Sequence, residues 1–409
     1  MPTVAPRSVL LDVTRLASRV GAGPATGIDR VERAMLRGLL ARDTELYGLS
    51  RTARGFVVLD RAGLGLFARQ LDGAAPWGPA DLAGRLSLRL PEARRAAESD
   101  LRRAATARAG RSGLAAMLAA ALPAGTVYLN VGHSNLGDSV FAALRAVPAA
   151  RAAVFIHDTI PLRLPRTQAP GATARFAARL AVAGHHADVL LCPSRAERDH
   201  IAAALGEARR QEIAVVPLGT DRVVPDPQAL KAAGGPPLAP YFVAVGTIEP
   251  RKNIGLLLDL WEHLERAPPP GGLPGLCLAG RRGWETPAFF RRLDALKARL
   301  PALREFPDLS DGAKAALVAG ARGLLFPSRA EGYGLPPLEA LSLGVMPVCA
   351  PLPVYAETMG DAGVYADPDD MYHWASIVCA LADGGPGVTS GWTAPAWDDH
   401  VNTVLATIA

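Results

Sequence analysis

A pair of cations stands where an anion could bind. Arg251 and Lys252 follow the apolar run YFVAVG, which ends at Gly246, and precede an amphipathic helix predicted over residues 253–265 with Asn253 as its cap. A helix N-terminus carries roughly half a positive charge, so two cations beside it are unfavourable unless an anion lies close. A diphosphate meets this requirement, because backbone N–H groups and both cations would converge on it. A solvated surface pair is the alternative.

A glycine-bearing loop follows a second apolar run, GLLFPS. Pro336 is expected at the first position of the next helix, which Gly344 ends. Gly332 and Gly334 lack a Cβ atom, so the backbone can approach a ligand closely. The N–H groups of Gly334 and Leu335 are therefore expected to point at a phosphate.

Two carboxylates, Glu331 and Glu339, flank this loop. A carboxylate accepts two hydroxyl hydrogen bonds, so the pair suits a ribose and a sugar on either side of one diphosphate. Glu339 has a second explanation, because an acid in the first helical turn also complements the helix dipole.

Further polar candidates follow apolar runs in the first half of the chain. His157 and Asp158 end one run, His133 follows another, and Gly27 and Arg30 open a predicted helix. These residues are candidates for the acceptor or phosphate side of a site. For His157, His133 and Arg30, the residues alone fit a structural role equally well.

Short aliphatic runs and amphipathic stretches alternate along the whole chain, which is typical of parallel sheets covered by helices. A Pro- and Gly-rich stretch interrupts this alternation. We therefore expect an α/β chain of two doubly wound, Rossmann-like domains facing an interdomain cleft. The expected segments are an N-terminal acceptor domain (1–220), a linker (221–240), a nucleotide-sugar domain (241–390) and a C-terminal helix that returns to the first domain (391–409).

Composition narrows the class of protein. The chain has 409 residues, 49% of them hydrophobic and 20% charged, which excludes wholesale disorder. No apolar run approaches the length that spans a bilayer, and the first residues show no secretory pattern. The four cysteines are widely spaced within apolar runs, so we expect buried thiols in a reducing, cytoplasmic compartment.

Positive charge is concentrated in residues 85–111, which hold eight arginines and three acidic residues. The stretch lacks the aromatic residues and motifs of a nucleic-acid binder, so no nucleic-acid partner is expected. Two interpretations stay open: contact with an anionic membrane surface, for which Arg94, Arg95, Arg102 and Arg103 are the candidate charges, and a solvated helical excursion.

Taken as a set, these motifs resemble a known family. EPRKN after a strand, then PSRAEGYGLPPLEALSLGVMPV with its Glu331–Glu339 pair, and then DAGVYADPDD are similar to the retaining glycosyltransferases of family 4, which have the GT-B fold. TGIDRVE, LNVGHSNL, IHDTIPLRLP and CPSRAERDHI in the first half resemble bacterial exopolysaccharide and O-antigen mannosyltransferases. The sequence departs from the family at Ala25-Thr26-Gly27, where two glycines are usual.

The resemblance implies a role for each matched residue. Arg251 and Lys252 match the cations on the donor diphosphate, and Glu339 matches the glutamate that holds the ribose. Glu331 matches the acidic residue at the transferred sugar, and His157 matches the histidine that lines the donor sugar from the opposite domain.

The implied function is retaining, metal-independent transfer of a hexose from a nucleotide-diphosphate sugar to a glycan or lipid-linked acceptor, at the inner face of the plasma membrane. GDP-mannose is the first expected donor, and no cofactor is expected. A phosphorylase, a sugar-nucleotide epimerase and a non-catalytic nucleotide-sugar-binding scaffold remain alternatives.

Overall fold

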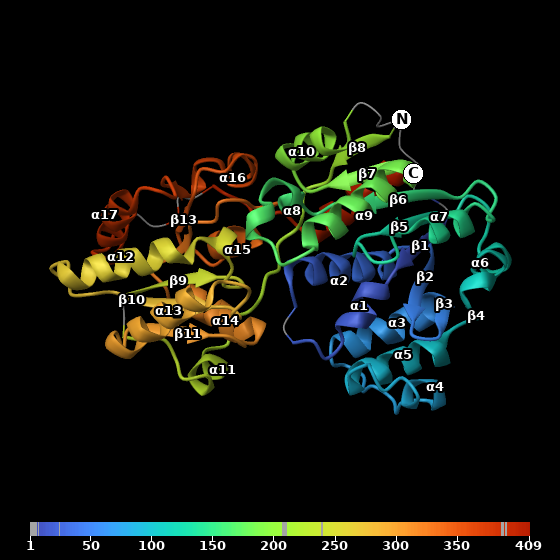
Figure 1. Ribbon diagram of the computed structural model, residues 1–409, viewed down its shortest axis with the longest axis horizontal. Helices are drawn as coiled ribbons and strands as arrows, with labels where there is room; N and C mark the ends of the chain where they lie inside the picture. Colours follow the sequence, from blue (N-terminus) through green and yellow to red (C-terminus); the bar gives the residue numbers. More distant parts are fainter. Residues whose placement is uncertain are drawn as a thin grey trace. The chain divides into compact units, whose positions relative to one another are not determined.

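The computed structural model describes residues 6, 8–23, 25–206, 211–238, 240–385, 388 and 391–409. The chain divides into two compact α/β units (Figure 1). Unit 1 comprises residues 1–157, 174–219 and 396–409, and unit 2 comprises residues 158–173 and 220–395.

Unit 1 is built on an eight-stranded sheet in the order β4-β3-β2-β1-β5-β6-β7-β8. Its strands are β1 (Ser8–Asp12), β2 (Glu45–Thr52), β3 (Gly55–Leu59), β4 (Ala107–Ala109), β5 (Val127–Asn130), β6 (Arg151–Phe155), β7 (Val189–Cys192) and β8 (Glu212–Val215). β3 runs antiparallel to both of its neighbours, and the other pairs are parallel. The chain fills one side of β1 first and then crosses to β5 on the other side. The β1–β5 junction is therefore the topological switch point, where ligands of such sheets bind.

The helices of unit 1 connect these strands. They are α1 (Thr14–Arg19), α2 (Gly27–Leu40), α3 (Arg61–Leu71), α4 (Leu82–Arg85), α5 (Glu92–Ala104), α6 (Leu114–Ala121), α7 (Asp138–Leu144), α9 (Ala172–His186), α10 (Arg195–Leu205) and α18 (Trp397–Ile408), with a 3₁₀ turn, η1 (Arg111–Gly113). The C-terminal helix α18 packs on α2, so the chain ends in unit 1 (Figure 1).

Side-chain caps explain where two of these helices begin. Thr26 Oγ1 accepts from the Asp29 N–H, and the Asp29 carboxylate accepts from the Thr26 N–H at 2.7 Å, which is a reciprocal capping box at the start of α2. Ser194 Oγ accepts from the Glu197 N–H at 3.1 Å, as its spacing to Glu197 predicts for α10.

Unit 2 is built on a parallel six-stranded sheet in the order β11-β10-β9-β12-β13-β14. Its strands are β9 (Tyr241–Val245), β10 (Gly275–Ala279), β11 (Leu303–Phe306), β12 (Gly323–Phe326), β13 (Pro347–Cys349) and β14 (Val364–Tyr365). Its helices are α8 (Ile160–Arg163), α11 (Pro227–Ala232), α12 (Ile254–Arg266), α13 (Pro287–Arg299), α14 (Asp311–Ala319), α15 (Leu335–Ser342), α16 (Pro353–Thr358) and α17 (Met371–Ala382), with 3₁₀ turns η2 (Pro165–Thr167), η3 (Pro250–Lys252) and η4 (Gly360–Ala362).

The apolar face of α12 explains the core of unit 2. Trp261 on α12 and Trp374 on α17 are fully buried and pack with Phe242 of β9 in one cluster. The Trp261 indole N–H donates to the Pro274 carbonyl at 2.8 Å, so the ring is buried without an unpaired donor.

The structure differs from the expected segments at two places. Residues 221–240, expected as a linker, carry α11, which packs on α14, and they belong to unit 2. Asp226 caps this helix by accepting from the Ala229 N–H at 2.9 Å, a local signal that the proline and glycine content of the stretch obscured. Residues 158–173 also belong to unit 2 rather than to the N-terminal domain.

The cysteines are free thiols, three of them buried and Cys379 half-buried. Over the described ranges, none of the helices combines the length and the apolar character needed to cross a bilayer.

Candidate active site

The two predicted phosphate loops lie side by side at one edge of the unit 2 sheet. One follows β9 and the other follows β12, and these strands are paired in parallel, so their carboxyl ends meet. The Arg329 N–H donates to the Arg251 carbonyl at 2.8 Å and joins the two loops. This register brings Arg251 and Lys252 of the first loop next to Glu331 of the second.

Glu331 lies between the two predicted cations. Its Oε1 atom is 2.7 Å from Arg251 Nη1 and 2.6 Å from Lys252 Nζ. The side chains of Lys252 and Glu331 are each 9% exposed, whereas that of Arg251 is 20% exposed. Arg251 also donates to the Ala330 carbonyl at 3.0 Å. The three charged groups form one buried cluster in which Arg251 is the most accessible member.

Glu249 is a fourth member that the sequence interpretation missed. Its Oε1 lies 2.5 Å from Arg251 Nε, and the residue is 4% exposed. Its signal in the sequence is its place two residues before Arg251, within EPRKN. The two cations therefore have two carboxylate partners, so an external anion is not required to neutralise them.

Burial and charge act in opposite directions on the pKa values of this cluster. Burial favours a raised pKa for Glu331, but Arg251 and Lys252 outweigh it and hold the pKa below its usual value. Burial lowers the pKa of Lys252, and Glu331 offsets part of that shift. Burial raises the pKa of Glu249 against the opposing effect of Arg251 and Lys252. Glu331 is thus the more firmly ionised of the two carboxylates.

The backbone at Gly246 and the ring of Phe326 also position the Lys252 side chain. Gly246 has φ +135°, and a Cβ atom there would lie 3.2 Å from Lys252 Cε, so the glycine leaves room for the lysine stem. The Lys252 ammonium sits 4.2 Å from the centroid of the Phe326 ring, a cation–π contact at the end of β12. Gly246 therefore shapes the site through Lys252.

The local backbone around Arg251 and Lys252 corrects one prediction. Both residues lie in the 3₁₀ turn η3, and Asn253 takes a left-handed conformation with φ 53° before α12 begins at Ile254. The Asn253 side chain does not cap α12; its Nδ2 donates to the Pro368 carbonyl at 3.1 Å. The left-handed turn separates the two cations from the first turn of the helix.

The glycine loop opens α15 as expected, with a shift of one residue. Leu335 is the first residue of the helix and Pro336 the second, and Gly344 follows its end with φ 75°. Gly334 has φ 90°, and a Cβ there would lie 2.5 Å from Tyr355 Cε1. Gly334 is required by this packing as well as by its backbone conformation.

Other groups border the same loop. Gly332 is buried, and Glu339 is half-buried on α15. The Tyr355 hydroxyl is buried and lacks a hydrogen-bond partner among the described residues. An unsatisfied hydroxyl therefore lies beside Gly334 at the N-terminus of α15, where Pro336 and Pro337 carry no N–H group.

Two candidates of unit 1, His133 and His157, lie together. Their ring centroids are 5.1 Å apart, His133 Nε2 donates to the Phe155 carbonyl at 2.6 Å, and His157 Nε2 donates to the Val131 carbonyl at 2.7 Å. Burial lowers the pKa of His133 to about 4 and that of His157 well below its usual value. Both rings are therefore neutral near pH 7, with the proton on Nε2.

The remaining three candidates divide between the two units. Gly27 is exposed at the start of α2, and Arg30 is half-buried one turn further on. Asp158 belongs to unit 2, where burial raises its pKa and Arg251 opposes the shift. Asp158 accepts from the Ile160 N–H at 3.1 Å, which begins α8.

Within the part of the chain that the structure describes, no group of three or more His, Cys, Asp or Glu residues is arranged to hold a metal ion.

Residues 239–383 match the family model described as "Glycosyl transferases group 1". This range contains η3, Glu331 and α15, so the match covers the charged cluster. The matched range lies in unit 2. The chain is 31% identical over 223 residues to the serotype-specific mannosyltransferase WbdA of Escherichia coli, covering 51% of this chain and 27% of that protein.

A second relative matches a shorter region. The O-antigen chain mannosyltransferase B of Escherichia coli is 39% identical over 136 residues, which is 32% of this chain and 34% of that protein. The chain thus spans about a quarter to a third of the length of these curated relatives.

Solved structures show the fold of the whole chain. A sucrose-phosphate synthase from Thermosynechococcus elongatus superposes with a TM-score of 0.59 at 17% identity, covering 98% of this chain and 94% of that one. HepE of Anabaena, solved with UDP-glucose, gives a TM-score of 0.58 at 13% identity and the same coverage. The chain therefore has the GT-B fold, as the sequence predicts.

Proposed function

We propose that this chain is a retaining glycosyltransferase that moves a hexose from a nucleotide-diphosphate sugar to a hydroxyl of a glycan or lipid-linked acceptor in surface polysaccharide synthesis. The observation that carries the proposal is the cluster of Arg251, Lys252 and Glu331 within the range that matches the glycosyl transferases group 1 model. In this proposal unit 2 holds the donor and unit 1 the acceptor.

The donor diphosphate would bind where the two loops meet. Arg251 and Lys252 supply positive charge, and the N–H groups of Gly334 and Leu335 lie at the N-terminus of α15. The unsatisfied Tyr355 hydroxyl beside Gly334 adds a further donor. Glu339 on α15 is proposed to hold the ribose hydroxyls.

The reaction exchanges one bond at the anomeric carbon for another. The bond from that carbon to the phosphate oxygen breaks, the bond to the acceptor oxygen forms on the same face, and the departing phosphate takes the acceptor proton. Arg251 and Lys252 would stabilise the negative charge that develops on the diphosphate, which is the main catalytic contribution expected of this site. Because these cations neutralise the leaving group, we propose that transfer needs no divalent metal ion and no cofactor.

Glu331 would act at the transferred sugar. Its ionised carboxylate can accept sugar hydroxyls or balance positive charge at the anomeric carbon. The role of His157 at the donor sugar stays a prediction, with Nδ1 of its neutral ring as the available acceptor.

Mannose is the proposed hexose and GDP-mannose the proposed donor. The proposal rests on relatives whose names state mannosyl transfer.

A panel of nucleotide sugars tests the proposed function. The chain is incubated with GDP-mannose, UDP-glucose and UDP-N-acetylglucosamine, with and without a mannan acceptor and with EDTA. We expect the chain to release a nucleoside diphosphate, and we expect this activity to persist in EDTA. The NMR coupling of the product should show that the anomeric configuration is retained. Phosphate-dependent cleavage would indicate a phosphorylase, interconversion of the sugar an epimerase, and binding without turnover a scaffold.

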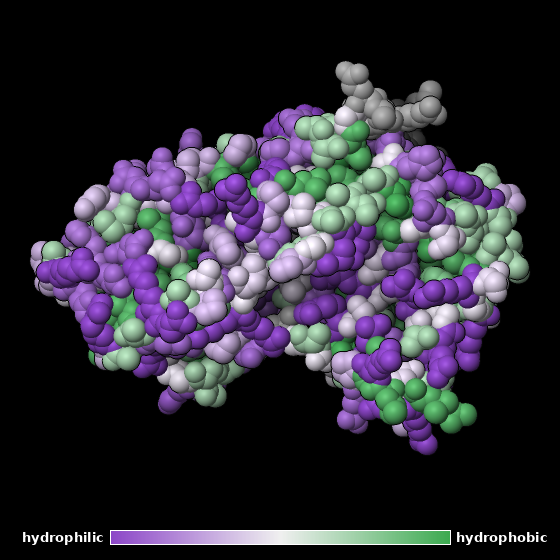
Figure 2. All heavy atoms as spheres, in the orientation of Figure 1, coloured by the Kyte–Doolittle hydropathy of each residue, from purple (hydrophilic) through white to green (hydrophobic). Residues whose placement is uncertain are grey.

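We further propose that unit 1 contacts an anionic membrane surface, at the cytoplasmic face of the plasma membrane. Leu82, Leu86 and Leu88 are 74%, 64% and 80% exposed, and they alternate with the exposed Arg85 and Arg89. Figure 2 shows hydrophobic side chains gathered at the α4 end of unit 1. We call these five residues the Leu/Arg patch. Apolar side chains beside arginines suit the interface of an anionic bilayer.

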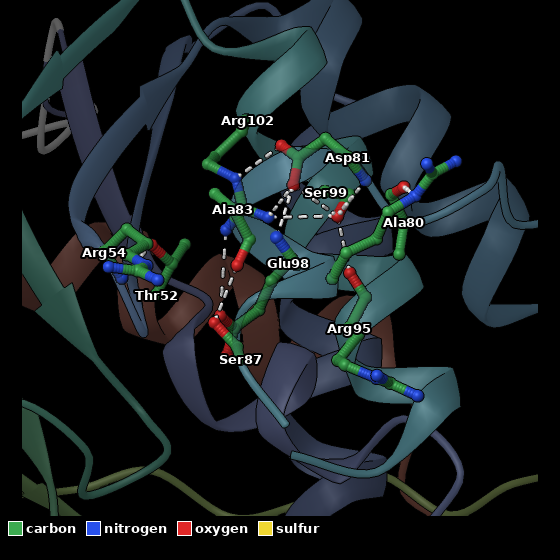
Figure 3. Close-up of polar contacts among 12 residues, drawn as sticks. Thr52, Arg54, Ala80, Asp81, Ala83, Ser87, Arg95, Glu98, Ser99 and Arg102 are labelled. Atoms are coloured by element: carbon green, nitrogen blue, oxygen red, sulfur yellow. Dashed lines mark hydrogen bonds and ion pairs between the residues drawn. The ribbon is translucent and has the colours of Figure 1, made fainter. Parts of the chain in front are cut away.

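The four arginines that the sequence suggested for this contact are not part of the Leu/Arg patch. Arg102 is 6% exposed and donates through Nη2 to Asp81 at 2.6 Å, while Ser99 accepts from the Asp81 N–H (Figure 3). Arg94 pairs with Glu98 at 2.9 Å, and Arg103 pairs with Asp100. Arg102 therefore ties α5 to the N-terminal cap of α4, whereas the pairs of Arg94 and Arg103 lie within α5.

A further inference from the structure

A cavity of about 830 Å³ lies within unit 1 and is not part of the charged cluster of unit 2. Its walls come from α1, which follows β1, from the loop 132–137, which follows β5, and from residues near the end of β2. These are the carboxyl ends of neighbouring strands at the topological switch point of the sheet. The volume falls within the range of small-molecule sites.

Five arginines line this cavity: Arg15, Arg19, Arg51, Arg111 and Arg179. None of its lining residues is acidic. Arg51, Arg111 and Arg179 are exposed, and their side chains form no hydrogen bond or ion pair with the residues that the structure describes. They come from β2, η1 and α9, far apart in the sequence. The cavity therefore carries positive charge that the protein leaves unneutralised.

Arg15 is fixed in place by two buried acidic residues. Its Nη1 donates to Asp29 at 2.5 Å and to Glu32 at 2.7 Å, and both acids are buried. Its Nη2 donates to Thr26 Oγ1 at 3.2 Å, which ties it to the capping box of α2. Arg15 is thus a rigid wall of the cavity, whereas the three unpaired arginines supply the free charge.

The loop after β5 adds neutral polar groups. Asn135 has φ 59°, and its Nδ2 donates to Asp12 at 2.8 Å and to Thr14 at 2.6 Å, while its buried Oδ1 lacks a partner among the described residues. His133 has φ 57°, and its pKa of about 4 keeps it uncharged. Two left-handed non-glycine residues in one short loop indicate a conformation that the surrounding bonds impose. An amide oxygen and a neutral imidazole suit sugar hydroxyls.

We propose that this cavity binds the acceptor through an oxyanion, so that the acceptor is a sugar that carries a phosphate or carboxylate group. The proposal rests on the proposed function, which assigns the acceptor to unit 1. Arg51, Arg111 and Arg179 bind the oxyanion, and the loop 132–137 contacts the sugar. Arginine suits both groups, because its planar fork donates two parallel hydrogen bonds to either.

Calorimetric titration of the full chain tests this assignment. Inorganic pyrophosphate and glucuronic acid serve as charged probes and mannose as the neutral one. Every protein carries Lys252→Met, so that the unit 2 cluster does not dominate pyrophosphate binding. The test variant is R51Q/R111Q/R179Q. The control is R54Q/R89Q/R108Q, which removes the same charge from exposed arginines of unit 1 that do not line the cavity. All six positions are exposed, so folding is expected to persist.

We expect at least one charged probe to bind the test variant tenfold or more weakly than the control, with mannose affinity equal in both. The probe that responds identifies phosphate or carboxylate as the group. The proposal is overturned if the affinity for the charged probes falls equally in both variants. It is also overturned if neither charged probe binds at millimolar concentration. Donor turnover by the wild-type chain is measured separately. Turnover without the binding difference rejects the cavity alone, and the binding difference without turnover on any donor rejects the proposed function alone.

Discussion

Replacement of Glu331 by glutamine separates the two functions of the charged cluster. Glu331→Gln keeps the shape and one hydrogen-bond acceptor but removes the charge between Arg251 and Lys252. Breaking a buried ion pair costs about 3–5 kcal/mol. We expect the free energy of unfolding to fall by about 3 kcal/mol, the lower end of this range. Arg251 retains its ion pair with Glu249, and Lys252 retains its cation–π contact with Phe326. For a unit of this size the loss lowers the melting temperature by ~6–12 °C.

The same change should strengthen binding of a diphosphate. An anion that enters the wild-type site competes with Glu331 for both cations, and in the variant it does not. One charge-assisted hydrogen bond gained is worth roughly 1.5–3 kcal/mol, so pyrophosphate and GDP are expected to bind about tenfold or more tightly. Pyrophosphate should then raise the melting temperature of the variant more than that of the wild type. Hexose transfer should nevertheless be lost.

Glu305 provides a matched control in the same unit. Its side chain is 7% exposed and lies 2.7 Å from both Arg282 and Lys297, so it also bridges two cations. Glu305→Gln should lower stability without changing pyrophosphate affinity. Calorimetry and thermal unfolding measure both quantities. A Glu331→Gln protein with wild-type stability, or with weaker pyrophosphate binding, would contradict the role of Glu331 as the internal partner of the two cations.

Three further perturbations test other parts of the structure. Lys252→Met keeps the stem but removes the charge, so GDP affinity and kcat/KM should both fall at least tenfold; unchanged GDP binding by calorimetry would contradict the clamp. Burial raises the pKa of Glu32 from 4.5 to about 8. Between these two pH values the folded chain holds a proton that the unfolded chain has released. The contribution of Glu32 to the free energy of unfolding therefore falls as pH rises from about 4.5 to 8. Glu32→Gln should flatten that decline in urea unfolding, and an unchanged pH profile would count against it. Leu82→Ser, Leu86→Ser and Leu88→Ser together should weaken binding to phosphatidylglycerol vesicles at least tenfold, and equal sedimentation of the variant and the wild type would reject the lipid contact.

The sequence predicted those elements whose signal is local. Apolar runs such as YFVAVG and GLLFPS became β9 and β12, and Ser194 caps α10 through its spacing to Glu197. The short strand β4 (Ala107–Ala109) was missed because three residues carry no periodicity. β2 (Glu45–Thr52) was missed because its charged and apolar residues do not form one aliphatic run.

The sequence predicted the residues of the candidate site but not the contacts between them. Arg251, Lys252 and Glu331 were named from loop chemistry, and parallel pairing of β9 with β12 brings them together. The sequence interpretation attributed the need for an anion to the dipole of the following helix. The left-handed Asn253 and the carboxylate of Glu249 make that argument unnecessary.

The arginine-lined cavity could not be predicted at all. Arg51, Arg111 and Arg179 come from three separate elements, and they meet only through the order of the strands and the crossing of the chain from β1 to β5.

A crystal structure of the chain with bound GDP shows directly whether a donor diphosphate binds at the charged cluster. We expect the diphosphate within hydrogen-bond distance of Arg251 and Lys252, with its oxygens against the N–H groups of Gly334 and Leu335. A diphosphate bound elsewhere, with the Arg251–Glu331–Lys252 contacts intact, would reject this assignment.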